Sequence, residues 1–281
     1  MTYKALAVDL DGTLLHSDEK LTLRSLDALK AAAEAGLRVI IATARWLQLA
    51  ERVARRIERV ARKISTKEPI IACAGAQVRR ETDNHDLLDL RLPSKFAGQL
   101  YAILDRRRCI ASIALDEVVL IKMDGNPDPS LFPSEATLVR KLCGQVDTAP
   151  RIALIQGNEA NAEVVTLLKE PWKDHVRFVE SFSSRGKSML TLTAAQANGG
   201  AALSVACADM GISSADVISF GDAEADIEMF KVSGASVAMG QASDLVKSFA
   251  TAVTLSNDDD GVALAIEGLL RTGSLPRPKR K

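Results

Sequence analysis

Short apolar segments alternate with amphipathic segments near the N-terminus. Residues 3–10 (YKALAVDL) and 38–43 (RVIIAT) are short and mostly apolar, which predicts two buried strands. Residues 22–36 and 45–64 repeat apolar side chains at helical spacing, and Gly36 lies where a helix C-cap belongs. The pattern therefore predicts the order strand, helix, strand, helix in this part of the chain.

The same alternation continues with another strand and returns near the C-terminus. Residues 69–78, 216–222 and 235–240 predict three more buried strands, the first with a turn at Gly75. Residues 201–211 and 262–270 have the pattern of helices. Strands and helices that alternate in this way predict an α/β fold, in which helices cover both faces of a doubly wound, Rossmann-like parallel sheet.

The middle of the chain has a different pattern, with charged loops, clustered prolines and shorter apolar runs. We expect residues 79–188 to form a separate α/β unit, inserted into a core made of residues 1–78 and 189–281. Within the insertion the pattern predicts strands at 110–115, 118–123 and 151–156, and helices at 136–144 and 160–170.

The composition of the whole chain bears on the cellular compartment and on the kinds of partner to expect. Of the 281 residues, 47% are hydrophobic and 26% are charged, and the formal net charge is zero. No global field favours nucleic acid or an anionic membrane, so we expect neither as a partner. The four cysteines form no CxxC pair and the three histidines are far apart, which disfavours a disulfide framework or a zinc site. No signal peptide is visible, and we expect a cytoplasmic protein.

Four carboxylates lie at the ends of predicted strands in the two halves of the core. Asp9 and Asp11 follow the first strand in VDLDGTLL, and Asp222 and Asp226 follow a later strand in GDAEAD. Ligands of an open parallel sheet gather beyond the carboxyl ends of its strands, so these acids converge if the two strands are neighbours. Gathered carboxylates repel one another, and a hard divalent cation such as Mg²⁺ removes that cost.

A magnesium ion at this position allows an aspartate to act as a nucleophile on a phosphoryl group. The aspartyl-phosphate that forms is then hydrolysed, while the metal neutralises charge on the transferring oxygens. Asp11 is placed to protonate the leaving oxygen and later to activate water. Thr43, at the end of the next strand, and the backbone amides after Asp9, at Leu10 and Gly12, can bind phosphate oxygens.

Each acidic motif also has a purely structural interpretation. An isolated DGT is typical of a turn, and GDAEAD is typical of a helix start whose acids are favoured by the helix dipole. The two motifs in this order, at strand ends on either side of an insertion, favour a shared site instead.

The chain resembles haloacid dehalogenase (HAD) superfamily phosphatases of the Cof type, which carry a C2-type α/β cap between their second and third motifs. The resemblance covers nearly the whole chain, and it implies that the insertion is the cap. It rests on five segments: DLDGTLL, ATAR (residues 42–45), GDAEADIEMF (residues 221–230), VAMG and SNDDDGVALAIE (residues 256–267).

The resemblance implies a role for each acid. Asp9 would be the nucleophile, and Asp11 would be the general acid and base. Asp222 and Asp226 would hold Mg²⁺ together with Asp9 and the backbone carbonyl of Asp11. The substrates of this family are phosphorylated sugars, flavin mononucleotide, pyridoxal phosphate and other small metabolites. We expect such a metabolite as the partner of a monomer or weak homodimer.

The resemblance also extends to the phosphate-binding segment. Thr43, Ala44 and Arg45 of the ATAR segment would bind the phosphate, with Arg45 facing the substrate entrance. Leu10 and Gly12 would add the backbone amides already described.

The chain departs from the family pattern at three positions of one pocket. Gly199 stands where the family's third motif has a lysine that bridges the nucleophile and the phosphate. Losing this charge-assisted hydrogen bond costs roughly several kcal/mol in the transition state unless Lys187 or Arg185 replaces it. Ala74 and Ala225 stand where the family usually has asparagines.

Three functions remain open on the sequence. The intact pair Asp9 and Asp11 favours a phosphatase, with activity weakened by the loss of the lysine. A non-catalytic protein that binds a phosphorylated metabolite would also retain the acidic site. A phosphomutase shares the acid pair, but its cap is usually smaller and helical.

Overall fold

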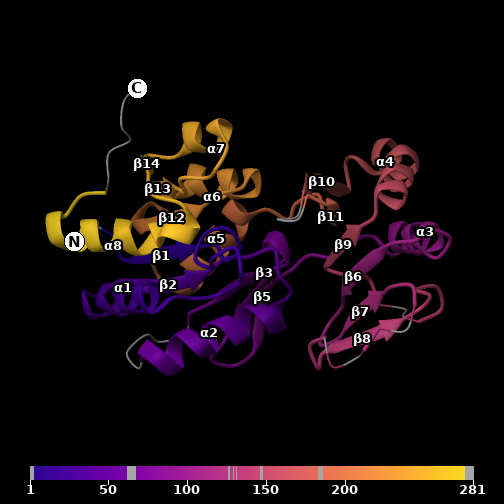
Figure 1. Ribbon diagram of the computed structural model, residues 1–281, viewed down its shortest axis with the longest axis horizontal. Helices are drawn as coiled ribbons and strands as arrows, with labels where there is room; N and C mark the ends of the chain where they lie inside the picture. The colour runs from indigo at the N-terminus through magenta and orange to yellow at the C-terminus, as the bar shows by residue number, and fades with distance from the viewer. Residues whose placement is uncertain are drawn as a thin grey trace. The chain divides into compact units, whose positions relative to one another are not determined.

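The computed structural model describes residues 3–61, 68–125, 127–128, 130, 132–145, 148–182 and 186–275. These residues form two compact units, coloured along the chain in Figure 1. The core unit contains Met1–Leu88 and Asn198–Lys281, and the inserted unit is Asp89–Ala197.

The core unit is built on a five-stranded parallel sheet with the strand order β14-β13-β12-β1-β2. Val8 at the end of β1 pairs with Phe220 of β12 on one side and with Ile41 of β2 on the other. The carboxyl ends of these three strands therefore lie at one edge, and the predicted parallel α/β core is confirmed. The strands are β1 (Ala5–Val8), β2 (Arg38–Ile41), β12 (Val217–Gly221), β13 (Ala235–Ala238) and β14 (Ala252–Val253).

Helices pack on the sheet because this contact buries their apolar faces against the apolar side chains of the strands. Ala5 and Ala7 of β1 share a core cluster with Ala202 and Ala206 of α5, while α1 packs against α8. The Asn198 side chain caps α5 by accepting a hydrogen bond from the backbone N–H of Ala201 at 2.8 Å. The helices of this unit are α1 (Leu23–Glu34), α2 (Leu47–Ala61), α5 (Gly199–Asp209), α6 (Ile227–Val232), α7 (Asp244–Phe249) and α8 (Gly261–Thr272).

The strand predicted at 69–78 is divided into two strands at the turn expected at Gly75. The segment forms β3 (Ile70–Ala72), a one-turn 3₁₀ helix (Cys73–Gly75) and β4 (Gln77–Arg80), which runs antiparallel to β3. Three successive residues of the turn have positive φ, with Ala74 at 55°, and this reverses the chain direction. An apolar run alone does not reveal such a reversal, since both strands of the hairpin are buried.

The inserted unit has its own six-stranded sheet with the order β10-β11-β9-β6-β7-β8. All neighbouring strands are antiparallel except β7 and β8. Phe96 of α3 lies at the centre of the core, where its ring meets those of Trp172 and Phe178 edge to face, with centroids 5.5 and 5.9 Å away. The elements are α3 (Ser94–Leu104), β6 (Ile110–Ala114), β7 (Val119–Lys122), β8 (Ala136–Val139), β9 (Ile152–Gln156), α4 (Asn158–Trp172), β10 (Val176–Phe182) and β11 (Ser188–Ala194).

The helix predicted at 136–144 is wrong, because this segment contains β8. Its backbone pairs with β7 in parallel, with Leu120 opposite Thr137 and Lys122 opposite Val139. β-Branched side chains such as Thr137 and Val139 suit a strand, and the pairing with β7 decides the outcome. The predicted helix at 160–170 is confirmed as part of α4.

The position of β5 determines where the inserted unit begins. β5 (His85–Asp89) extends the sheet of β3 and β4, and all but its last residue belongs to the core unit. The boundaries expected at 79 and 188 thus fall within β4 and at the first residue of β11.

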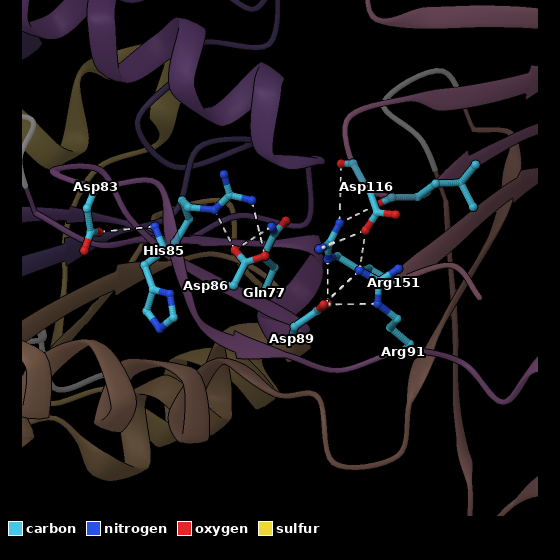
Figure 2. A network of polar contacts seen from close by, with 10 residues as sticks. Gln77, Asp83, His85, Asp86, Asp89, Arg91, Asp116 and Arg151 are labelled. Carbon is cyan, nitrogen blue, oxygen red and sulfur yellow. Dashed lines mark hydrogen bonds and ion pairs between the residues drawn. The ribbon is translucent and has the colours of Figure 1, made fainter. Parts of the chain in front are cut away.

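Figure 2 shows how the two ends of β5 are anchored by different ion pairs. In the core unit, Asp86 accepts hydrogen bonds from Gln77 Nε2 at 2.9 Å and from Arg79 Nε at 2.6 Å. In the inserted unit, Asp89 accepts hydrogen bonds from Arg91 Nη2 at 2.8 Å and from Arg151 Nε at 2.7 Å. Since Arg151 is buried, its pairing with Asp89 satisfies a charge that would otherwise be costly.

Across the described ranges, no helix combines the length and the apolar character needed to cross a membrane.

Replacing Phe96 with alanine is expected to destabilise the inserted unit by about 3–5 kcal/mol, because a fully buried ring is removed from a packed aromatic cluster. Urea unfolding followed by tryptophan fluorescence measures the change, since Trp172 reports on this core. The control is Leu167→Ala in α4, where the side chain is half exposed. Equal losses in the two variants would contradict the assignment of Phe96 to the centre of the core.

Candidate active site

The loop after β1 begins the candidate site. Asp9 continues β1 and donates its backbone N–H to the carbonyl of Phe220 at 3.2 Å. The chain then turns, with the N–H of Leu14 bonded to Asp9 O at 3.2 Å and that of Leu15 to Leu10 O at 2.8 Å. Leu10 is fully buried under this turn, so its side chain anchors the loop. Asp9 is thereby held at the carboxyl edge of the sheet beside the end of β12.

Three of the four predicted acids converge at this edge. Asp9, Asp222 and Asp226 each offer one carboxylate oxygen, and these atoms all lie within 4.8 Å of one another. Asp226 Oδ2 accepts the backbone N–H groups of Asp222 at 3.0 Å and Ala223 at 2.9 Å. Hard oxygen ligands at this spacing suit a divalent cation such as Mg²⁺.

Burial and mutual repulsion raise the pKa values of these acids. The pKa of Asp9 lies well above its ordinary value, first because the group is buried and then because Asp226, Asp222 and Asp11 repel its negative charge. Burial raises the pKa of Asp226 to about 7, although the N–H of Ala223 opposes the shift. Burial also raises the pKa of Asp222. A cation in this pocket would restore the ionised forms.

Two glycines allow the carboxylates to approach the backbone. A Cβ on Gly12, which has φ +78°, would lie 2.5 Å from Oδ2 of Asp222. A Cβ on Gly221 would lie 2.4 Å from the carboxyl carbon of Asp226. A side chain at either position would clash with one of these carboxylates. The close approach of Asp222 and Asp226 to the backbone therefore depends on the two glycines.

Asp11 lies outside the group of three acids. Its side chain is half exposed and pairs with Arg45 in a bidentate arrangement, with Nε–Oδ2 at 2.7 Å and Nη2–Oδ1 at 2.5 Å. Arg45 also reaches Glu19 at 3.3 Å. The hydrogen bond to Asp11 is the largest influence that raises the pKa of Arg45. The predicted general acid and the predicted phosphate-binding arginine are thus in direct contact.

The remaining residues predicted to bind phosphate lie close to this pair in the chain. Thr43 is buried just beyond β2, and its hydroxyl accepts the backbone N–H of Arg45 at 3.1 Å. Ala44 is exposed between them.

Gly199 begins α5, next to the segment that carries Asp226. A Cβ on Gly199 would lie 3.5 Å from Met229 Cβ and 3.8 Å from the carbonyl oxygen of Ala225, both ordinary contacts. A side chain can therefore be added here without a clash at its first atom. Of the two substitute cations considered above, Lys187 belongs to the inserted unit, and Arg185 lies outside the described residues.

Sequence reasoning missed two polar residues that contact Asp222. The Thr13 hydroxyl donates to Oδ1 of Asp222 at 3.2 Å, and Gln241 Nε2 lies 3.5 Å from its Oδ2. Thr13 belongs to the DGT motif and Gln241 follows VAMG, so the motifs pointed to their neighbourhood but not to these contacts.

Three comparisons bear on the family. A profile of the haloacid dehalogenase-like hydrolases matches residues 6–266. The chain is 28% identical to the 5-amino-6-(5-phospho-D-ribitylamino)uracil phosphatase YwtE of Bacillus subtilis, over 95% of this chain and 98% of the relative. It is 26% identical to the pyridoxal phosphate phosphatase YbhA of Escherichia coli, over 94% and 97%.

Solved structures share the fold. A haloacid dehalogenase-like hydrolase from Bacteroides thetaiotaomicron superposes with a TM-score of 0.78 at 24% identity, covering 95% of this chain and 99% of that one. The profile match over residues 6–266 includes both the core unit and the inserted unit, in line with the resemblance that the five motif segments carry. The chain therefore belongs to the haloacid dehalogenase-like hydrolases.

Proposed function

We propose that this protein is a Mg²⁺-dependent phosphatase that hydrolyses a small phosphomonoester through an aspartyl-phosphate. The main support is the convergence of Asp9, Asp222 and Asp226 within 4.8 Å at the carboxyl edge of the sheet. The printed names of the relatives support the same class, since YwtE and YbhA are phosphatases of small phosphorylated metabolites. A sugar phosphate, flavin mononucleotide or pyridoxal phosphate is the proposed kind of substrate.

The residues of the pocket fit a magnesium ion. Asp9, Asp222, Asp226 and the backbone carbonyl of Asp11 would hold it, because three carboxylate oxygens within 4.8 Å of one another offer hard ligands at one point. When bound, the ion would neutralise negative charge on the phosphate and on these carboxylates.

Asp9 and Asp11 divide the covalent chemistry. A carboxylate oxygen of Asp9 attacks phosphorus, and the bond from phosphorus to the leaving oxygen breaks as Asp11 donates a proton to that oxygen. Asp11 then takes a proton from water, whose oxygen attacks phosphorus and releases inorganic phosphate from Asp9.

Arg45 and Thr43 would bind the phosphate beside the two aspartates. The Arg45 guanidinium presents a rigid fork of donors that matches phosphate oxygens as well as it matches the Asp11 carboxylate. An incoming phosphate would therefore compete with Asp11 for Arg45 and release Asp11 for proton transfer.

A binding protein without catalysis is the second candidate. Gly199 favours it, because no side chain at the start of α5 carries the charge that the family places there. Replacement by Lys187 or Arg185 stays a prediction, as do the cytoplasmic location and the oligomeric state.

Asp9→Asn is expected to lower the rate of p-nitrophenyl phosphate hydrolysis by on the order of a thousandfold or more, because an amide is a poor nucleophile. Release of p-nitrophenol is measured with and without Mg²⁺ in the parent and the variant. Asp209→Asn is the control, since Asp209 pairs with Arg80 away from the cluster. If the parent releases no product but still binds phosphate, the binding protein is the correct assignment.

Gly199→Lys is expected to raise kcat roughly tenfold or more, because one charge-assisted hydrogen bond contributes about 1.5–3 kcal/mol. The space at the Gly199 Cβ position permits the change. Gly199→Met adds a long side chain without a charge, so it should not raise kcat. An unchanged kcat in the lysine variant would indicate that another cationic side chain already binds the phosphate.

Without metal, the protein is expected to lose stability as the pH rises from about 4 to about 7. Asp226 has a folded pKa of about 7, above the ordinary 3.8, so the folded state binds more protons than the unfolded state between these values. Thermal unfolding across this pH range measures the slope. Saturating Mg²⁺ should flatten it, and Asp226→Asn without metal should reduce it, with Asp9 and Asp222 left to contribute the remainder. A stability that rises over this range in the metal-free parent would contradict the raised pKa.

A further inference from the structure

Gln241 occupies a position that the backbone fixes closely. It follows Gly240, whose N–H donates to the carbonyl of Leu255 at 2.9 Å. A Cβ on Gly240 would lie 2.8 Å from the carbonyl carbon of Leu255 and from the nitrogen of Ser256. The two chain segments therefore touch backbone to backbone, and Gln241 is carried to the edge of the acidic pocket.

The amide of Gln241 is oriented by its two sets of partners. Its Oε1 accepts the backbone N–H of Asn257 at 3.2 Å. Its Nε2 donates to the carbonyl of Gly12 at 2.5 Å and lies 3.5 Å from Oδ2 of Asp222. The donor end of the amide is thus directed to the loop after Asp9 and to a carboxylate of the pocket.

Asn257 holds the same loop at a second point. Its side chain is buried, and Nδ2 donates to the carbonyl of Leu15 at 3.0 Å. Gln241 and Asn257 together bind the loop at Gly12 and at Leu15.

We propose that Gln241 is a positioning residue for the magnesium site, which it serves by orienting the Asp222 carboxylate and the loop at Gly12. The proposal rests on the proposed function, since it concerns the same metal. A neutral amide suits this role because it donates a hydrogen bond to Asp222 without adding charge. Thr13 holds the other oxygen of Asp222, so the carboxylate has a donor on each side.

The exposure of Gln241 separates this role from one in packing. Its side chain is exposed, so its loss should cost little stability, whereas a group that orients a metal ligand should change metal affinity. The two effects can be measured independently in the full-length protein.

The test is the affinity for Mg²⁺ alone, measured by calorimetric titration of the metal-free full chain. Gln241→Met, which keeps the length of the side chain, should weaken binding about tenfold or more, as is typical of outer partners of metal ligands. Its melting temperature without metal should match that of the parent, because the side chain is exposed. Ser248→Ala, on the exposed side of α7, is the matched control and should bind Mg²⁺ as the parent does.

Asp222→Asn identifies the site, because it should abolish the Mg²⁺ binding seen in the parent. Loss in this variant with unchanged affinity in Gln241→Met would overturn the role of Gln241 and leave the proposed function standing. A parent that binds no Mg²⁺ would overturn both. Gln241→Ala replaces the methionine variant if the latter does not fold, and the same outcomes then decide.

Discussion

Repulsion among three carboxylates in one largely buried pocket is the constraint on which the rest of the structure depends. Burial disfavours negative charge at Asp9, Asp222 and Asp226, and the charges of Asp222 and Asp226 further disfavour ionisation of Asp9. Backbone N–H groups and neutral side chains offset part of that cost, and a divalent cation would offset the rest. The fold thus holds together groups that would separate in the free chain.

The parallel sheet provides the rigidity that this arrangement needs. β1 and β12 are central neighbours, so the residues that follow them leave the sheet at the same edge. Gly12 and Gly221 remove the side chains that would keep the carboxylates from the backbone. Secondary structure therefore sets the distance between the acids, and the two glycines make that distance attainable.

The acids could be found from the sequence because a strand end beside a carboxylate is a local pattern. The local sequence pattern gave the wrong element at β8, where pairing with β7 decides the structure. It also did not reveal the reversal of the chain at Ala74, which positive φ values produce. The contact of Asp11 with Arg45 and the position of Gln241 depend on three-dimensional proximity between segments far apart in the chain. No periodicity in a single sequence encodes such contacts.

The attachment of the loop after Asp9 to Asn257 has a consequence for biosynthesis. Asp9, the proposed nucleophile, leaves the ribosome well before Gln241 and Asn257, which hold its loop. A nascent chain thus carries this loop without its partners until the segment from Gln241 to Asn257 has been made. The hydrogen bonds that hold the loop can therefore form only after the segment that carries Asn257 has left the ribosome.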